Sequence, residues 1–565
     1  MTDPDSAREA ERKRFLRSYY SFVLHLFCLA LYLLPILAPS EFHKDTPVLD
    51  ELHICSPENR DVNGETTLRQ IFSNDYWGRP MDSPSSHKSW RPLTILSFRY
   101  LKGGSLLKDL TAHRIMNVMT HAATADLVGH LATLVVPNHG MLQWLHPTAK
   151  LVFALQSTHV EVTANAANRP HLLATLCGVL LANPYSSWWV FLPTLCCGYL
   201  CAETFLFQLV PILVTIVVIC RVQKRQLPWF RLVLVAMSAG VYYGARWYFD
   251  TLSIPDGLIR PAENPFYGFE GMHRARNYLY VLSVHVLKAW NVDLLGFSHE
   301  YGFECIRAIE SWTDPRMLAP LGIGLIYVTT GLVVLFRKSK VPLCLYLFHV
   351  SWMATLFPIA GIVKVGTFIA DRIAVASTVS TSVLTAYWIA QWISDRKQWK
   401  LLILVVIGSI QVRRVHYRTL EWMNSLPLLE SSLRTCPRFA KAHVEISKVY
   451  SGLYPSKLNL TKSRWHLEQA EEIDPDYCDV NQQFAHIAIQ ERKYSEFEER
   501  LTKSLLCQFT MSGSLDLWRR YWSMATDTTS NPPDVVDAAQ KRYDKYMGII
   551  NEHIQREESL AAATP

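Results

Sequence analysis

Apolar residues occur in repeated runs over the first three quarters of the chain, and the pattern then changes. The runs approach the ~20 residues that a membrane-crossing helix needs, and short basic or aromatic segments separate them. From residue 413 onward, apolar positions take the spacing of amphipathic helices. The pattern predicts an all-α chain with a membrane-embedded helical part and a polar helical part. The expected crossings are 19–37, 116–136, 148–166, 171–183, 187–201, 203–220, 229–249, 317–336, 342–362, 374–394 and 401–412.

Basic clusters set the expected orientation of these crossings. Four basic residues between positions 12 and 17 precede the first run, and the positive-inside tendency keeps them in the cytosol. About eleven crossings, an odd number, place the polar helical part on the opposite side, which in a eukaryote is the lumen of the endoplasmic reticulum. The glycosylation acceptor pattern at Asn459-Leu460-Thr461 agrees with that side. The expected domains are 1–18 (cytosolic), 19–412 (multi-pass, with a first luminal loop at 39–115) and 413–565 (luminal).

One further apolar stretch, 277–296, breaks this parity if it crosses. It contains His285, Lys288 and Asp293, which are costly in lipid. We therefore expect it to enter the membrane from the luminal side and to pack against protein.

Composition narrows the class of protein. Half of the 565 residues are hydrophobic and 19% are charged, which is too apolar for an ordinary soluble enzyme of this size. The net charge of +7 lies in short clusters beside apolar runs, so it indicates contact with membrane lipids and gives no support to a nucleic-acid partner. Several of the twelve cysteines lie in apolar runs and are expected to be small buried side chains. Candidates for luminal disulfides, with the pairing left open, are Cys55, Cys436, Cys478 and Cys507.

The polar part has the cadence of a tetratricopeptide repeat. An apolar helix ends at Ile473-Asp474-Pro475-Asp476, an alanine-bearing helix follows, and Lys493-Tyr494 precedes another helix. An earlier unit breaks at Cys436-Pro437. About two repeats and a helical cap are expected, which would offer a groove for an acceptor protein. A purely architectural set of helical hairpins is the alternative.

The first luminal loop, 39–115, contains two carboxylates that are candidates for a catalytic role. Asp45 lies just beyond the first span, where a general base can meet both a membrane-anchored substrate and a hydroxyl group arriving from water. Asp75 is the second candidate. Its neighbour Asn74 is expected to bind sugar hydroxyls, and Trp77 to stack on a sugar ring or to anchor at the membrane interface. A divalent cation is an additional ligand considered for Asn74 or Asp75.

Three basic residues follow in the same loop. His87, Lys88 and Arg91 lie within five positions, directly before an apolar run. A phosphate leaving group gains charge as its bond to a sugar breaks, and preorganised Lys or Arg donors stabilise that charge. Arg91 can bind such a group through two hydrogen bonds. The alternative is a nonspecific contact with lipid headgroups.

Four charged residues within or at the ends of the spans are further candidates. Glu161 and Arg169 should face a polar cavity, or form a buried ion pair, because they lie about two helical turns apart. Glu203 and Arg372 are expected at the luminal ends of spans. Either Arg169 or Arg372 is expected to contact a lipid phosphate, and the sequence does not choose between them.

Together these segments resemble the transmembrane and tetratricopeptide-repeat-containing protein O-mannosyltransferases, which have a GT-C fold. IFSNDYWG followed by SHKSWRPLTILSFR, at 71–78 and 86–99, is very similar to the most recognisable loop of that family. Other similar segments are 112–121, 153–162, 168–173, Glu203, 263–265 and 365–372.

The resemblance implies a GT-C-type membrane core, a luminal repeat domain, dolichyl phosphate mannose as the donor and Ser or Thr hydroxyls of secretory-pathway proteins as acceptors. It further implies an inverting single displacement, which needs no covalent intermediate. No cofactor is firmly implied, and a divalent cation is the one considered.

The chain also departs from the family pattern. One of two adjacent acids expected near Asp45 is absent, Ala202 replaces a lysine, and His171 replaces an aspartate. Two alternatives therefore stand beside the transferase: a noncatalytic luminal adaptor that binds client proteins, and a transporter. Related halves with broken helices would favour a transporter, and the sequence shows no such internal repetition.

Overall fold

The structure is a computed structural model whose described residues are all-α. Among them, the one β-type contact is an isolated bridge between Asn74 and Pro80. The chain divides into two compact units. Unit 1 comprises 1–255, 266–300 and 308–431, and unit 2 comprises 256–265, 301–307 and 432–565. The described residues are 22–37, 48–55, 59–83, 86–102, 109–136, 144–249, 251–252, 259, 263–302, 304–337, 340–362, 365–393, 398–453, 455–507 and 509–563.

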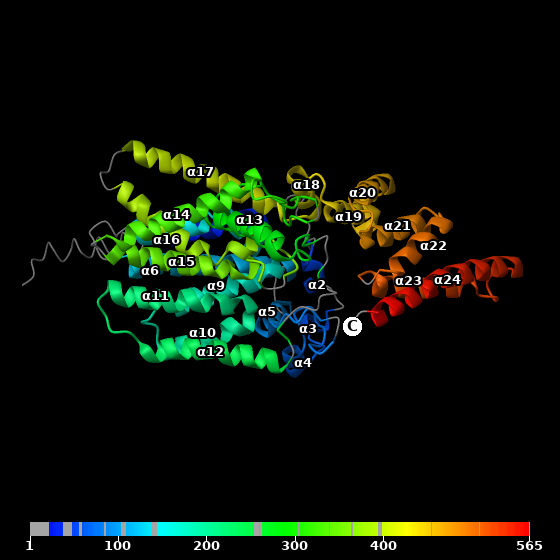
Figure 1. Ribbon diagram of the computed structural model, residues 1–565, viewed down its shortest axis with the longest axis horizontal. Helices are drawn as coiled ribbons and strands as arrows, with labels where there is room; N and C mark the ends of the chain where they lie inside the picture. Colours follow the sequence, from blue (N-terminus) through cyan, green and yellow to red (C-terminus); the bar gives the residue numbers. More distant parts are fainter. Residues whose placement is uncertain are drawn as a thin grey trace, which may run out of the picture. The chain divides into compact units, whose positions relative to one another are not determined.

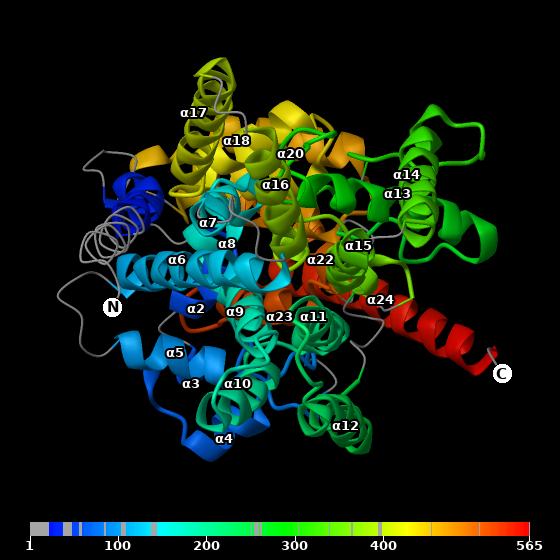
Figure 2. The same ribbon diagram turned by 90° about the vertical axis from the view of Figure 1, so that its left-hand side faces the viewer.

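Unit 1 is a bundle of apolar helices. Figure 1 shows its longer helices side by side, and Figure 2 views several of them end on, including α11, α12 and α15. Its helices, beside an apolar helix Phe22–Leu37, are α2 (Glu51–Cys55), α3 (Arg60–Asn63), α4 (Leu68–Ser73), α5 (Pro92–Lys102), α6 (Asp109–Val135), α7 (Leu145–Ala154), α8 (Val160–Ala164), α9 (Arg169–Leu181), α10 (Trp188–Cys201), α11 (Leu209–Val222), α12 (Trp229–Tyr248), α13 (Gly271–Ala289), α14 (Leu318–Leu335), α15 (Lys340–Met353), α16 (Thr378–Trp392) and α17 (Gln398–Glu421).

Several of these helices carry the surface expected of membrane spans. Within the described residues, the segments Glu203–Val222, Pro315–Leu335 and Val341–Ile359 are long and apolar enough to cross a bilayer. Only 11% of the apolar window at Pro315–Leu335 is buried inside the protein. Exposed apolar surface of this extent is typical of a helix that faces lipid. The molecule is accordingly a membrane protein.

One expected crossing is broken, so the prediction of a single helix over 148–166 is wrong. The chain forms α7, a short turn of 3-10 helix at Ser157–His159, α8 and a second short turn at Ala166–Asn168 before α9 begins. Side chains hold the breaks. Asn291 accepts hydrogen bonds from the backbone N–H and the hydroxyl of Ser157 at 3.2 and 2.8 Å, and Asn165 caps the second turn by accepting the N–H of Ala167. These polar contacts replace the helical ladder inside the bundle.

Short 3-10 segments also begin or end three other expected spans. Glu203–Gln208 precedes α11, Ala354–Ile359 follows α15, and Asp371–Ala374 precedes α16. The segment Ala354–Ile359 contacts both of the others. The breaks in four separate spans therefore bring irregular backbone and polar side chains together in unit 1.

The stretch 277–296 lies mostly in α13 and packs against protein, as its charged residues require. Lys288 is buried and lies 2.7 Å from a carboxylate oxygen of Asp371 and 3.5 Å from one of Asp293. Arg414 in turn lies 3.0 Å from Asp293. The sequence predicts a domain boundary at residue 412. The helix α17, which carries Arg414, continues past that residue, and the division between the compact units falls after residue 431.

Unit 2 is a series of packed helix pairs. α19 contacts α20, α21 contacts α22, and α23 contacts α24. Buried apolar residues such as Leu467, Phe484 and Phe497 form its core. This arrangement is compatible with tetratricopeptide repeats, which stay a prediction. The helices are α18 (Ser425–Thr435, across the division), α19 (Ala440–Lys448), α20 (Leu460–Ile473), α21 (Cys478–Gln490), α22 (Tyr494–Leu505), α23 (Met511–Ala525) and α24 (Pro533–Ala563).

Two disulfides lie in unit 2. Cys478 pairs with Cys507, and Cys436 pairs with Cys305. Three of these four cysteines were candidates from the sequence, whereas Cys305 was not. The side chain of Cys55, the remaining candidate, lies outside the described residues.

Candidate active site

Asp75 organises the described part of the loop that the sequence predicts to be the first luminal one. One carboxylate oxygen accepts the backbone N–H groups of Trp77 and Arg79, both at 2.9 Å. The other accepts the hydroxyl of Ser86 at 2.8 Å and the N–H of His87 at 3.0 Å. Asp75 is only 1% exposed. Four donors satisfy this buried carboxylate and fix the loop around it. The geometry thus gives Asp75 a positioning role, and its assignment as a base stays a prediction.

The neighbouring candidates support the same loop. The side-chain amide of Asn74 donates to both oxygens of the buried Asp61 at 3.1 Å. Trp77 packs edge-on against Tyr76, and its ring lies 6.1 Å from that of His87. The ammonium group of Lys88 donates to the carbonyl of Met81 at 2.5 Å. These contacts hold the loop together, and sugar or cation binding by its members stays a prediction.

Arg91 connects this loop to the bundle. Its Nε lies 2.8 Å from Oε2 of Glu203, and its guanidinium lies over the ring of Tyr76, 4.9 Å from the ring centre. Burial acts to lower the pKa of Arg91, but the charges of Glu203 and Tyr76 outweigh that effect and raise it, so Arg91 stays protonated. Oε1 of Glu203 is buried and has no hydrogen-bond partner among the described residues. The pair therefore retains an acceptor for a ligand.

Glu161 pairs with Arg372 and not with Arg169. The Arg372 guanidinium lies 2.5 Å from Oε1 of Glu161, and the Arg372 backbone N–H donates to Oε2 at 2.8 Å. Asn168 donates to Oε1 at 3.2 Å. Thr367 accepts a further guanidinium N–H at 3.1 Å. A fully buried carboxylate thus orients an arginine whose side chain is 16% exposed.

Arg169 is enclosed by protein. Its three nitrogens donate to Asn117, Ser97 and the carbonyl of His113 at 2.7–2.8 Å, and Phe98 stacks under the guanidinium at 4.5 Å. Arg169 is 0% exposed. These contacts satisfy the guanidinium within the bundle, which is the arrangement of a structural charge.

A cavity of about 160 Å³ opens beside the Glu161–Arg372 pair. Its lining includes Arg372, His171, Gln208, Thr204 and Thr355. The charges of both Arg91 and Arg372 act on His171, although Arg372 alone of the two arginines lines the cavity. Oε1 of Gln208 is buried without a hydrogen-bond partner among the described residues. The volume is below the ~300–1,000 Å³ of pockets for drug-sized ligands, and suits a polar headgroup.

Two further carboxylates, Asp45 and Asp50, belong to this part of the chain. Asp45 lies outside the described residues. Asp50, which sequence reasoning missed, is exposed and acts electrostatically on Arg372 and on Tyr76. The adjacent acids Asp50-Glu51 were the available signal.

Glu51 was also missed. Its carboxylate is fully buried, lies 2.6 Å from the Arg114 guanidinium, and accepts the N–H of Ala166 at 2.6 Å. This pair ties the start of the loop to α6 and to the second break before α9.

The chain has relatives among curated proteins over most of its length. It is 25% identical over 447 residues to the human Protein O-mannosyl-transferase TMTC4, covering 69% of this chain and 59% of that protein. It is 25% identical over 435 residues to Protein O-mannosyl-transferase F38B6.6 of Caenorhabditis elegans, covering 74% and 58%. The chain is related to the TMTC protein O-mannosyl-transferases.

A shorter match has a higher sequence identity. The chain is 37% identical over 129 residues to Protein O-mannosyl-transferase Tmtc2 of Drosophila melanogaster, which is 22% of this chain and 13% of that protein. Alignments with the two longer matches span less than two thirds of those relatives. No family model matches the chain, and no solved structure matches it. The relationship supports a mannosyltransferase role and leaves the donor and the acceptor to inference.

Proposed function

We propose that this protein transfers mannose from dolichyl phosphate mannose to Ser or Thr hydroxyls of secretory-pathway proteins. The observation that carries the proposal is the cavity lined by Arg372 and His171, where the charge of Arg91 also acts on His171. The chain that contains this cavity is related to protein O-mannosyl-transferases. A guanidinium group that lines the cavity, with a second one close enough to act on His171, suits a phosphodiester whose negative charge grows as its bond to sugar breaks.

The phosphate and the sugar of the donor each have suitable partners. Arg372, oriented by Glu161, and Arg91, oriented by Glu203, bind the phosphate. The acceptor atoms of Glu203 and Gln208 that lack hydrogen-bond partners bind sugar hydroxyls. Of the two arginines that the sequence left open, Arg372 is our choice for the phosphate, since Arg169 already donates to three protein acceptors.

The reaction is an inverting single displacement. A carboxylate takes the proton of the acceptor hydroxyl as its oxygen attacks the anomeric carbon. The bond from that carbon to the phosphate oxygen breaks, and dolichyl phosphate leaves with the electron pair. Asp45 is the first candidate for the base. Asp50 is a further candidate because it is exposed and interacts electrostatically with Arg372.

The proposed location is the membrane of the endoplasmic reticulum, with the N-terminus cytosolic and unit 2 luminal. Two disulfides in unit 2 support the luminal side, because disulfides persist in oxidising compartments. The helix pairs of unit 2 are proposed to bind the acceptor protein.

The test is a transfer reaction with purified full-length protein. Dolichyl phosphate mannose and folded luminal domains are supplied, and intact mass and NMR report the added sugar and its anomeric configuration. One added hexose of inverted configuration supports the proposal. Transfer only from dolichyl phosphate glucose would change the donor, and tight client binding without any added hexose would support the noncatalytic adaptor.

A further inference from the structure

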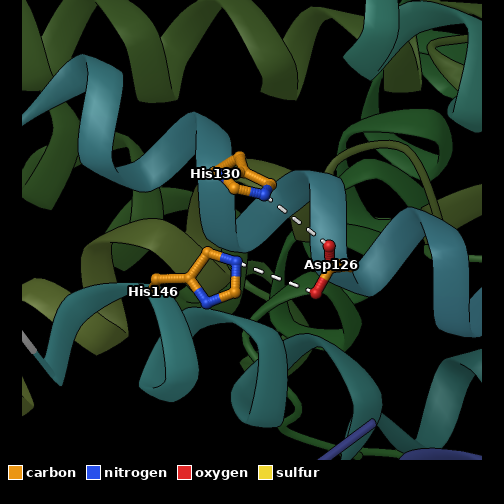
Figure 3. A group of neighbouring side chains, drawn as sticks. All are labelled: Asp126, His130 and His146. Atoms are coloured by element: carbon orange, nitrogen blue, oxygen red, sulfur yellow. Dashed lines mark ion pairs between the residues drawn. The ribbon is translucent and has the colours of Figure 1, made fainter. Parts of the chain in front are cut away.

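A second polar cluster lies in unit 1, on the far part of α6 from the candidate active site. Asp126 and His130 are one turn apart on α6, and His146 is in the first turn of α7. Figure 3 shows both imidazoles directed at the Asp126 carboxylate, from two different helices. Nε2 of each histidine lies 3.7 Å from an oxygen of Asp126. Asn117, which bonds Arg169, lies nine positions earlier on α6, roughly 14 Å along the axis.

The spacing of these atoms is close to that of a metal site. One ligand atom from each of the three residues lies within 4.8 Å of the others. A tetrahedral zinc ion with ligand bonds of about 2.0–2.1 Å places its ligands roughly 3.4 Å apart. Small rotations of the side chains would therefore suffice to bring the three atoms onto one ion. Two imidazoles and a carboxylate form a donor set that zinc-type ions prefer.

A glycine on α6 allows α7 to come close enough for His146 to reach the cluster. Gly129 lies between Asp126 and His130, and a Cβ atom there would meet the carbonyl oxygen of His146 at 2.8 Å and its ring at 3.0 Å. Any other residue would thus push α7 away from α6 at this point. The absence of a side chain at 129 lets His146 reach the cluster.

Unsatisfied polarity and access also favour a ligand. Nε2 of His146 is buried and has no hydrogen-bond partner among the described residues. The side chain of His130 is 65% exposed, which leaves the cluster open on one side. A third histidine, His25 of the helix Phe22–Leu37, interacts electrostatically with Asp126 and Lys150 and so lies in the same neighbourhood.

Lys150 modifies the site. Its ammonium group is buried and lies 2.6 Å from Oδ1 of Asp126, which leaves Oδ2 on the side of His130. A hydrogen bond from an outer partner orients a ligating carboxylate. The positive charge also repels a bound cation, since charges a few ångströms apart interact strongly when partly buried.

We propose that Asp126, His130 and His146 bind one exchangeable Zn²⁺ ion, with Lys150 orienting Asp126 and weakening the affinity. The bound ion joins α6 to α7. This site is separate from the proposed transfer reaction and does not depend on it.

The test uses Co²⁺ as a spectroscopic probe of the full-length protein, purified in detergent without a polyhistidine tag. We expect one equivalent of Co²⁺ to give the visible absorption bands of a four-coordinate ion, and Zn²⁺ to displace it. His130→Ala should weaken binding by more than the ~10–100-fold that loss of an outer-shell partner costs. Because His130 is exposed, this variant should fold normally.

Two further variants make the test specific. Lys150→Gln keeps a hydrogen-bond donor but removes the charge, and should bind the ion more tightly than the wild type. His553→Ala, in α24 of unit 2, is the control and should leave binding unchanged. The proposal is overturned if the wild type binds no Co²⁺ or Zn²⁺, if His130→Ala binds as tightly as the wild type, or if Lys150→Gln binds more weakly.

Discussion

Units 1 and 2 contain ion pairs that differ in solvent exposure. Unit 1 contains ion pairs that are enclosed by protein, such as Glu51–Arg114, where the side chains are 0% and 4% exposed. Unit 2 contains pairs that lie at the surface, such as Lys503–Glu499, where the side chains are 50% and 58% exposed. A charge inside an apolar bundle is costly unless its partners are well placed, whereas a surface charge is solvated in any case. The enclosed charges of unit 1 therefore indicate structural joints or a site, whereas an exposed pair such as Lys503–Glu499 belongs to a solvated face.

Two arginines extend this comparison within unit 1. Arg169 has protein acceptors for its three nitrogens, whereas Arg372 is held from one side by Glu161 and lines a cavity. From the sequence, Arg169 is expected within a span and Arg372 at the end of one. Only the arrangement of their partners distinguishes a structural arginine from one that can meet a ligand.

The largest effect on stability is expected at the Glu51–Arg114 pair. Arg114→Met leaves a buried carboxylate without its partner, which typically costs about 3–5 kcal/mol. Thermal unfolding of unit 1 in detergent measures the loss. Arg60→Met is the matched control, since the Arg60–Glu65 pair is 72% and 55% exposed and should contribute little. Equal effects of the two variants would contradict the contrast between buried and exposed pairs.

The next effect concerns unit 2 alone. Replacing Cys478 and Cys507 together with Ser removes a link across a sequence separation of 29, and we expect a loss of about 3–4 kcal/mol. Hydrogen exchange of the α21 and α22 amides in the full-length protein reports it. Cys196→Ser, at an exposed free cysteine of unit 1, should leave that exchange unchanged. Unaltered protection in the double variant would show that the disulfide does not stabilise unit 2.

Acid should weaken unit 2 through a histidine pair. Burial lowers the pKa of His466, to about 4, with His443 and Lys462 adding to the shift, and burial also lowers the pKa of His443. Both histidines therefore stay neutral in the folded state, while an unfolded chain takes up protons below about pH 6.5. The stability they contribute is lost as pH falls from about 6.5 toward 4. Exchange of the α19 and α20 amides measured across this range should follow that slope.

The matched variant for this prediction is His443→Gln with His466→Gln. Glutamine does not titrate, so part of the slope between pH 6.5 and 4.5 should disappear. A slope unchanged by the double substitution would assign the acid sensitivity to the carboxylates instead.

The smallest effect is expected at the surface of α22. Lys503→Ala removes an exposed pair with Glu499, one turn away, and should change stability by less than about 0.5 kcal/mol. Chemical denaturation followed by α22 exchange is sufficient to test this. A loss above 1 kcal/mol would mean that the surface of unit 2 depends on its charges as unit 1 does.

Much of the fold could be predicted from apolar periodicity, and less of the site. Most of the expected spans correspond to helices, because about 20 apolar residues in succession have few other options. The break of the expected span 148–166 could not be read, since it depends on Asn291, far away in sequence, accepting hydrogen bonds from Ser157. The pairing of Glu161 with Arg372, 211 positions away, could not be predicted either, because local helical spacing offers only Arg169 as a partner.

The loop chemistry shows a similar limit. Sequence alone placed Asp75 among the candidate bases, because an acid beside aromatics at a membrane surface has the right chemistry. Its four hydrogen bonds, two of them to Ser86 and His87 across the loop, become visible only when the loop is folded. Asp50 was overlooked although the adjacent acids Asp50-Glu51 were visible in the sequence, and its electrostatic interaction with Arg372 becomes apparent only in the folded chain.

The most direct test of the central claim is the initial rate of mannose transfer for Arg372→Ala beside Arg69→Ala. Arg69 lies exposed on α4 in the same unit and serves as the control. If Arg372 stabilises the departing phosphate, its loss should lower the transfer rate by roughly 10²–10³-fold, as for removal of a preorganised donor, while Arg69→Ala retains the wild-type rate. Wild-type transfer by a folded Arg372→Ala protein would contradict the account.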